Sequence, residues 1–126
     1  MARQEQFDSI TLEAAGDLSA GQFRFLAVDS NGRVAVVAAE GADSVGVLQN
    51  NPSALGRAAT VAYKGVVKVV IGTGGLTAGQ KAKSDAAGAA VLATATSSDH
   101  VLGTVLVGGA AGALAEILLG SRHILA

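Results

Sequence analysis

Apolar residues in this chain occur in short runs, which glycine, asparagine, aspartate and serine separate at close intervals. Residues 23–28 (FRFLAV) alternate in part and end at Asp29-Ser30-Asn31-Gly32, a strong signal for a tight turn, so residues 33–39 are expected to return as a hairpin partner. No stretch shows the 3.6-residue period of a long amphipathic helix. The pattern predicts an all-β fold, an antiparallel β-barrel or sandwich of short strands. Further strands are expected at residues 45–49, 58–63, 66–71, 81–83, 89–94, 101–107, 114–119 and 123–126.

The chain contains the same pattern twice. Residues 18–22 read LSAGQ and residues 76–80 read LTAGQ, and further identities recur about 56 positions apart. A solenoid would need three or more such units, so two copies predict one pseudo-symmetric domain in which each half covers the other's apolar face. We expect an N-terminal arm at residues 1–15, with room for one short strand at its end, and a single β domain at residues 16–126, with pseudo-repeats at approximately 18–72 and 76–126. The recurring pairs are Asp29 and Asp85, Gly32 and Gly88, Asp43 and Asp99, Val45 and Val101, Gly56 and Gly112, and Ala59 and Ala115.

The composition narrows the range of functions. Half of the residues are hydrophobic but only 3% are aromatic, so the core is built mainly from small side chains. The net charge is −1 and there is no basic stripe, which argues against binding nucleic acid through its phosphates. The absence of cysteine excludes disulfides, thiol catalysis and cysteine-ligated metal sites.

One segment has the hydrophobicity of a membrane span. Residues 101–119 are almost continuously apolar and contain Gly108-x-x-x-Gly112, a spacing typical of packed membrane helices. The matching stretch of the first repeat, residues 45–63, contains the polar sequence QNNPS, which could not cross lipid. We therefore interpret residues 108–112 as a loop and expect no membrane insertion. The polar N-terminus, MARQEQFDS, predicts no secretory signal.

Two groups of residues have the types that catalysis or metal binding would need. Ser98-Asp99-His100 resembles the composition of a hydrolase triad, but sequence neighbours rarely adopt triad geometry, and Asp99 recurs as Asp43 at an expected turn. The two histidines, His100 and His123, have no carboxylate at a spacing that indicates a metal site. We predict no catalytic residue and no metal ligand here.

Two further motifs suggest cofactor or carrier functions. The glycines at 72–75 and 108–112 lack the lysine and the following helix of phosphate-binding loops, so turns are the favoured interpretation. Tyr63-Lys64-Gly65 places a lysine in a hairpin-like setting, as in biotinyl or lipoyl carrier domains, but the characteristic flanking residues are missing. The sequence therefore predicts a protein that is not an enzyme and binds no cofactor.

The order and spacing of the segments resemble those of the small β-rich capsid decoration, or cement, proteins of tailed bacteriophages. The resemblance implies a virion protein on the capsid exterior, made in the host cytoplasm, that binds the major capsid protein and stabilises the expanded shell. It also implies a homo-oligomer, with a trimer favoured. The segments that carry the resemblance are residues 18–22, 44–48 (SVGVL), 59–69 (ATVAYKGVVKV), 76–81 (LTAGQK), 101–106 (VLGTVL) and the final strand.

Two elements are expected to contact the shell or another protein. The first is the polar arm, with Arg3, Gln4 and Glu5 and the apolar anchors Phe7 and Ile10. Deletion of residues 2–13 is expected to abolish shell binding without unfolding the domain. The second is the loop where the two repeats differ most, at Asn50, Asn51 and Pro52. The alternative function is a non-catalytic β-module that binds another protein or carbohydrate, although few aromatic residues are present to form a sugar platform.

Overall fold

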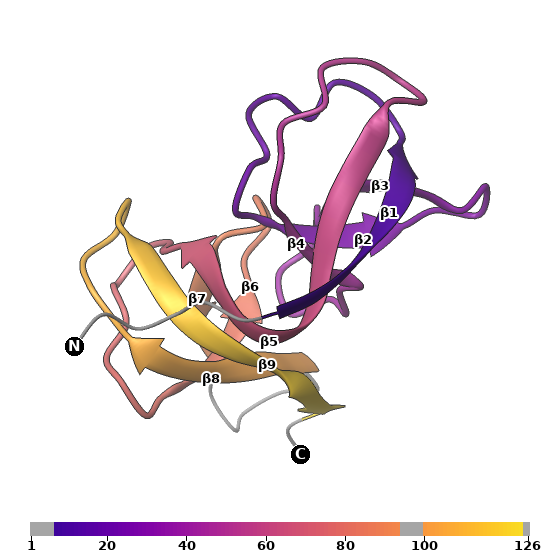
Figure 1. Ribbon diagram of the computed structural model, residues 1–126. Coiled ribbons are helices and arrows are strands. Elements are labelled where there is room, and N and C mark those ends of the chain that lie inside the picture. The colour runs from indigo at the N-terminus through magenta and orange to yellow at the C-terminus, as the bar shows by residue number, and fades with distance from the viewer. Residues whose placement is uncertain (1–6, 94–99, 125–126) are drawn as a thin grey trace.

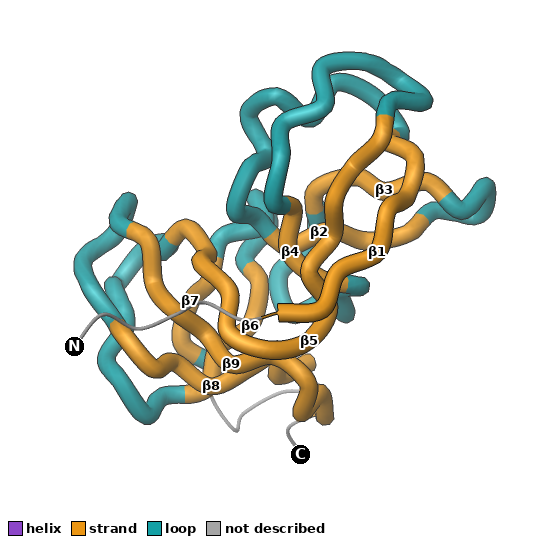
Figure 2. Tube along the Cα trace, viewed as in Figure 1, coloured by secondary structure: helices purple, strands orange, loops and turns teal. Residues whose placement is uncertain are grey.

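The computed structural model describes residues 7–93 and 100–124, with residues 120–124 described for their backbone alone. The described residues form nine strands and no helix, so the prediction of an all-β fold is confirmed (Figure 2). The strands are β1 (Phe7–Ala14), β2 (Phe25–Val28), β3 (Arg33–Val36), β4 (Gly46–Leu48), β5 (Ala58–Val70), β6 (Lys81–Ser84), β7 (Ala90–Leu92), β8 (His100–Val107) and β9 (Leu114–Ile124).

The strands form two lobes that share β5 (Figure 1). In lobe 1, strand β1 pairs with the first half of β5 and also with β3, and the ring closes through β2 and β4. In lobe 2, the second half of β5 pairs with β9, and the sheet continues through β8 and β6 to β7. A parallel bridge between Ile71 and Ala90 returns β7 to the end of β5. Each lobe is therefore a small sheet of five strands that curls back on itself.

The two lobes have the same topology. A parallel contact joins the first and third strands of each lobe, and all the other strand pairs are antiparallel. Strands β2, β3 and β4 correspond to β6, β7 and β8, and β1 corresponds to the second half of β5, with Ala14 equivalent to Ile71, at about the spacing seen in the sequence. The structural unit thus begins at β1, before residue 18, where the two copies share no identical residues.

The repeated aspartates build the same turn in both lobes. The Asp29 Oδ1 atom accepts hydrogen bonds from the backbone N–H groups of Asn31 and Arg33, at 2.9 and 3.0 Å. The Asp85 Oδ1 atom accepts the equivalent bonds from Ala87 and Ala89, at 2.8 and 2.9 Å. A side-chain acceptor of this kind fixes a turn locally, which is why the hairpins β2–β3 and β6–β7 could be read from sequence.

The core crosses the boundary between the lobes. The larger buried cluster includes Phe25 and Val47 of lobe 1 together with Val67 and Ile117 of lobe 2. A smaller cluster around Leu26 and its neighbours fills lobe 1 alone. Burial of apolar surface stabilises the fold by about 25 cal/mol per Å². Since the residues of one lobe bury part of the apolar surface of the other, folding of each lobe depends on the other.

The second half of the expected N-terminal arm is a strand. Residues 7–14 form β1, which pairs with β5 from Phe7↔Gly65 to Glu13↔Ala58 and closes lobe 1. The Ala14 side chain is fully buried, so the C-terminal end of β1 belongs to the core. Most side chains of β1 are exposed and several are polar, so the sequence pattern did not indicate that this strand pairs with the domain. Residues 1–6 of the expected arm lie outside the described part of the chain.

The apolar segment at residues 101–119 forms two strands and a loop. Strands β8 and β9 pair with each other, and residues 108–113 connect them, in agreement with the interpretation of this glycine cluster as a loop. Among the described residues, no helix is long and apolar enough to cross a membrane.

Candidate functional site

Two of the connecting loops of each lobe meet at one tip. Tip 1 consists of residues 15–24 and 49–57, and tip 2 of residues 71–80 and 108–113. The two tips are anchored alike, because the Leu18 N–H donates to the Pro52 carbonyl oxygen at 2.8 Å and the Leu76 N–H donates to the Gly109 carbonyl oxygen at 2.9 Å. Both leucines are buried and form the base of their tip.

Tip 1 is held by polar side chains. The Asn50 amide donates to the Ala58 carbonyl oxygen at 3.0 Å and accepts from the Thr60 N–H at 2.9 Å. The Gln22 amide donates to the Gln49 carbonyl oxygen at 2.9 Å. These bonds tie the loop to β5 and to the neighbouring loop, so most of its amide groups already have partners within the molecule.

One carboxylate of tip 1 is electrostatically distinct. The Asp17 side chain receives hydrogen bonds from the Ser19 hydroxyl and from the Ser19 backbone N–H, and these hold the pKa of Asp17 below its ordinary value. The cause is local, because Asp17 is fully exposed, and a hydrogen-bonded turn carboxylate of this kind is a structural feature.

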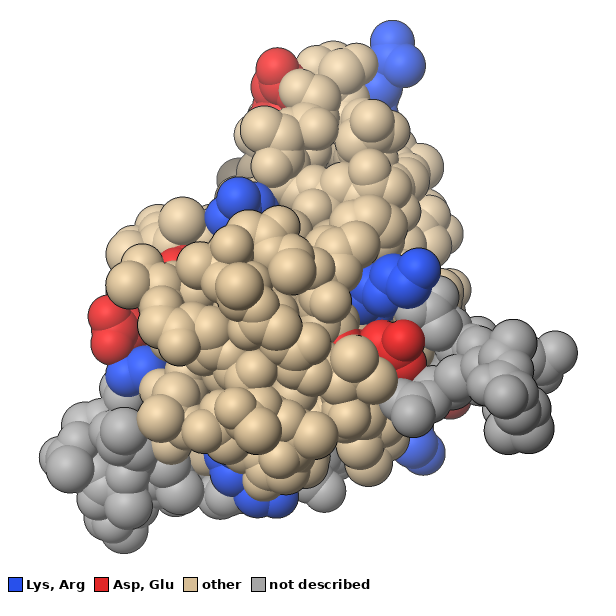
Figure 3. Space-filling view, turned by 90° about the vertical axis from the view of Figure 1, so that its left-hand side faces the viewer, with Lys and Arg blue, Asp and Glu red and all other residues tan. Residues whose placement is uncertain are grey.

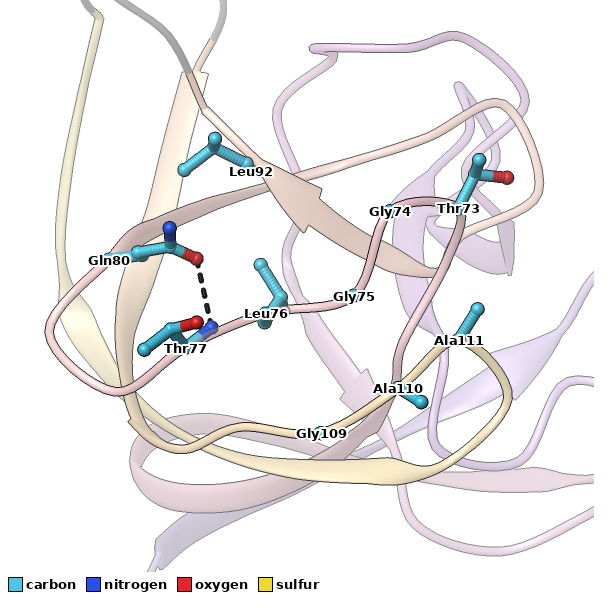
Figure 4. A pocket seen from close by; sticks show the side chains of 10 residues that line it. All are labelled: Thr73, Gly74, Gly75, Leu76, Thr77, Gln80, Leu92, Gly109, Ala110 and Ala111. Atoms are coloured by element: carbon cyan, nitrogen blue, oxygen red, sulfur yellow. Dashed lines mark hydrogen bonds between the residues drawn. The ribbon is translucent and has the colours of Figure 1, made fainter.

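Tip 2 carries a cavity of about 450 Å³, within the range of about 300–1,000 Å³ that ligand pockets have (Figure 4). Its lining contains no charged side chain. The Gln80 side chain accepts a hydrogen bond from the Thr77 N–H at 2.9 Å and so fixes one rim. The lining residues are Thr73, Gly74, Gly75, Leu76, Thr77, Gln80, Leu92, Gly109, Ala110 and Ala111.

Glycine is required where the two loops of tip 2 meet. A side chain at Gly108 would collide with the Leu76 carbonyl group, and one at Gly75 would lie 2.9 Å from the Gly109 carbonyl oxygen. The close approach of the two backbones leaves only small residues along this part of the cavity. Gly75 and Gly108 therefore serve backbone contact, whereas Gly74 and Gly112 have left-handed backbones, with φ of 95° and 91°, in agreement with their interpretation as turn glycines.

The predicted contact residues do not form one surface. Phe7 and Ile10 are 37% and 41% exposed on β1, whereas Asn50, Asn51 and Pro52 lie in tip 1, beyond the other end of that strand. Asn51 is exposed, but Pro52 is buried. At about 3.3 Å per residue, the two groups lie roughly 20 Å apart along β1. The remaining predicted residues, Arg3, Gln4 and Glu5, lie outside the described part of the chain.

Most of the candidate chemical groups lie outside the side chains that the structure describes. The His100 ring lies 3.2 Å from the Gly41 carbonyl oxygen, and Ser98 and Asp99 fall outside the described residues. His123 belongs to β9, but only its backbone is described. No group of three or more potential metal ligands occurs among the described residues.

Lys64 is not presented on a hairpin turn. It lies inside the continuous strand β5 and pairs with Asp8 of β1, so the geometry of a lysine carrier domain is not present. The strand carries a β-bulge in this region, because the pairing skips Tyr63 between Ser9↔Ala62 and Asp8↔Lys64.

One charged cavity lies between the lobes, and its charged groups are engaged. The Lys83 ammonium, on β6, contacts the Glu40 carboxylate of the β3–β4 connection at 2.7 Å. Asp85, also in this cavity, holds the turn described above. The ion pair therefore joins one lobe to the other.

Sequence reasoning missed the apolar positions that lobe 2 exposes. Leu114 and Leu118 of β9 and Val107 of β8 are 39–45% exposed, and Leu92 of β7 borders the tip 2 cavity. The alternation along β9 could have indicated these positions, because Leu114 and Leu118 share its outer face with Glu116. The cavity itself has no sequence signal beyond the small residues of its loops.

These features define a class: all-β proteins of two like lobes that share a long strand. Among solved structures the fold is similar to "head fiber gp8.5 N base in bacteriophage phi29", with a TM-score of 0.68. The match covers 91% of this chain and 95% of that chain at 18% sequence identity, and at that identity it shows a common fold. No protein-family model matches the sequence. No curated protein matches it either.

Proposed function

We propose that this protein is a structural component of a phage virion that binds the outer surface of the capsid and stabilises the expanded shell. The observation that carries the proposal is the fold shared, over nearly the whole of both chains, with the base of a phage head fibre. The sequence resemblance to capsid decoration proteins supports the same assignment from a separate line of argument. The proposed partner is the major capsid protein.

The architecture suits adhesion to a repeating lattice. A shared strand, a common core and an ion pair hold the two lobes as one body, so loops at both tips can contact neighbouring capsid subunits at once. Several weak contacts to one lattice add to a large effective affinity. A closed homo-oligomer, with a trimer favoured, would multiply these contacts further. We propose no catalytic role.

The test is to mix the purified protein with expanded and unexpanded shells of the cognate phage and to image both by electron microscopy. We expect regular added density on expanded shells alone, and expanded shells that release their contents at a higher temperature when the protein is present. Bound density without any change in shell stability would support attachment and contradict the stabilising role.

The alternative is a β-module that binds another protein or carbohydrate. Phe7 and Tyr63, at 37% and 36% exposure, are the aromatic side chains that the described surface offers most openly, and they provide little area for sugar stacking. Absence of density on both kinds of shell, with binding to a glycan array, would favour this alternative over the virion role.

A further inference from the structure

The two tips occupy equivalent places but differ in shape. Gly56 and Gly112 correspond, since both have a left-handed backbone, with φ of 83° and 91°, and their N–H groups donate to Ala14 and Ile71 at the ends of equivalent strands. The residue before each glycine is Leu55 in tip 1 and Ala111 in tip 2. The same turn therefore carries a large apolar side chain in one lobe and a small one in the other.

Leu55 projects from tip 1 into solvent. It is 61% exposed, more than any other large hydrophobic side chain among those described. It follows Ala54, whose carbonyl oxygen accepts a hydrogen bond from the Arg57 N–H at 3.2 Å, so the turn that presents the leucine is closed. Residues 49–56 include no charged side chain. The leucine is thus an apolar knob on an uncharged loop. Its exposure to water is unfavourable in free energy unless another surface covers it.

Tip 2 has the complementary shape. The cavity lies where alanine replaces the leucine, and Gly109 also takes the place of Pro52, as the matching bonds to Leu76 and Leu18 show. The side of lobe 2 that carries these loops faces the viewer in Figure 3, where charged residues lie mainly around the margin of a largely uncharged surface. Contact between this surface and residues 49–56 would bury no charge, and burial of unpaired charge is the main electrostatic cost of forming an interface.

We propose that Leu55 of one copy of this chain inserts into the tip 2 cavity of a second copy. The two tips lie on different lobes and open at different parts of the molecule, so the contact joins molecules head to tail (Figure 1). Such a contact uses two different surfaces of each subunit and closes into a ring when the rotation between subunits allows it. Insertion of the leucine into a cavity without charged groups removes its side chain from water, and this burial of apolar surface favours association.

The experiment measures self-association in solution, without shells, so it fails or succeeds independently of the proposed virion role. Sedimentation equilibrium of the full chain over a range of concentrations gives the association constant. Leu55→Ser removes the knob, and Ala111→Leu places a larger side chain in the lining of the socket. The matched control is Leu118→Ser, an exposed leucine on the outer face of β9. Circular dichroism melting confirms that each variant is folded.

We expect the wild-type chain to associate, each tip variant to weaken that association at least about tenfold, and the control to leave it unchanged. An equimolar mixture of Leu55→Ser and Ala111→Leu should form one-to-one pairs, because one variant keeps the socket and the other keeps the knob, and no larger assembly, because each variant lacks its second surface. The proposal is overturned if the wild type is monomeric throughout, if Leu55→Ser associates like the wild type, or if the mixture stays monomeric. It is also overturned if Leu55→Ser loses shell binding while wild type and variant are both monomers, since the shell would then be the occupant.

Discussion

At the scale of single residues, some side chains act on their immediate neighbours in the sequence and others on distant parts of the chain. Asp29 and Asp85 each hold a turn through bonds to residues two and four positions later, so all the necessary information is local. Gly108 is different, because a side chain there would collide with the carbonyl group of Leu76, 32 positions earlier in the chain. Local patterns predicted its loop but not the contact that requires it.

The equivalence of the two turns leads to a paired prediction. Asp29→Ala and Asp85→Ala should each lower the free energy of unfolding by about 1–2 kcal/mol, because each leaves two backbone N–H groups without their charged acceptor. Asn at either position keeps an acceptor oxygen and should cost less than Ala. Urea denaturation of the four variants measures this. Equal stability of the Ala and Asn variants would show that the side-chain acceptor contributes little.

A glycine substitution tests the close packing of strands in lobe 2. A Cβ atom at Gly103 would lie 2.6 Å from the Leu118 carbonyl oxygen on β9, so Gly103→Ala should destabilise the protein by about 2 kcal/mol or more. Gly16→Ala is the matched control, since a Cβ there meets nothing within 4 Å. The control should be neutral within about 0.5 kcal/mol. Comparable melting temperatures for the two variants would contradict the packing of β8 against β9.

At the scale of elements, β5 is where sequence and structure differ most. The sequence predicted two strands separated at Lys64-Gly65, because these residues interrupt the apolar pattern. The chain instead continues as one strand from Ala58 to Val70, with the bulge at Tyr63 and a left-handed Gly65, φ 103°, absorbing the change in direction. Which neighbours pair with each half depends on strands far away in sequence, and no local pattern records that.

The shared strand predicts cooperative unfolding. Val34→Ala opens a cavity in the cluster of lobe 1, and Val67→Ala opens one in the cluster that spans both lobes, at a cost of about 2 kcal/mol each. Both should shift one single transition. Tyrosine fluorescence from Tyr63, the chain's one tyrosine, and far-ultraviolet circular dichroism provide two probes. Separate midpoints for the two probes would mean that the lobes unfold independently.

At the scale of the whole molecule, the duplication was visible in sequence but its extent was not. The identities begin at residue 18, whereas the equivalent strands begin at β1, where an apolar strand of lobe 2 matches a largely polar one. The tip 2 cavity was missed for a related reason. It is lined by residues of two loops that lie far apart in the sequence, and only the folded arrangement shows that these loops meet.

The finding that residues 7–14 form β1 changes the test of the predicted arm. Deletion of residues 2–13 would remove nearly all of β1 and open lobe 1, so loss of shell binding could not be distinguished from unfolding. Deletion of residues 2–6 removes Arg3, Gln4 and Glu5 and leaves β1 intact. We expect this variant to melt like the wild type and to bind expanded shells more weakly, as judged by co-sedimentation. Unchanged co-sedimentation would show that these residues are not a contact element.

The continuity of β5 also has a mechanical consequence. A force that pulls the two lobes apart along this strand acts on its covalent backbone in tension, and the hydrogen bonds to β1, β4 and β9 lie across that direction and are loaded in shear. Shear loads many bonds together, whereas peeling breaks them one at a time. A subunit built in this way would resist stretching between two anchoring points. An internally pressurised shell would place this kind of load on a protein bound across its subunits, as in the proposed function.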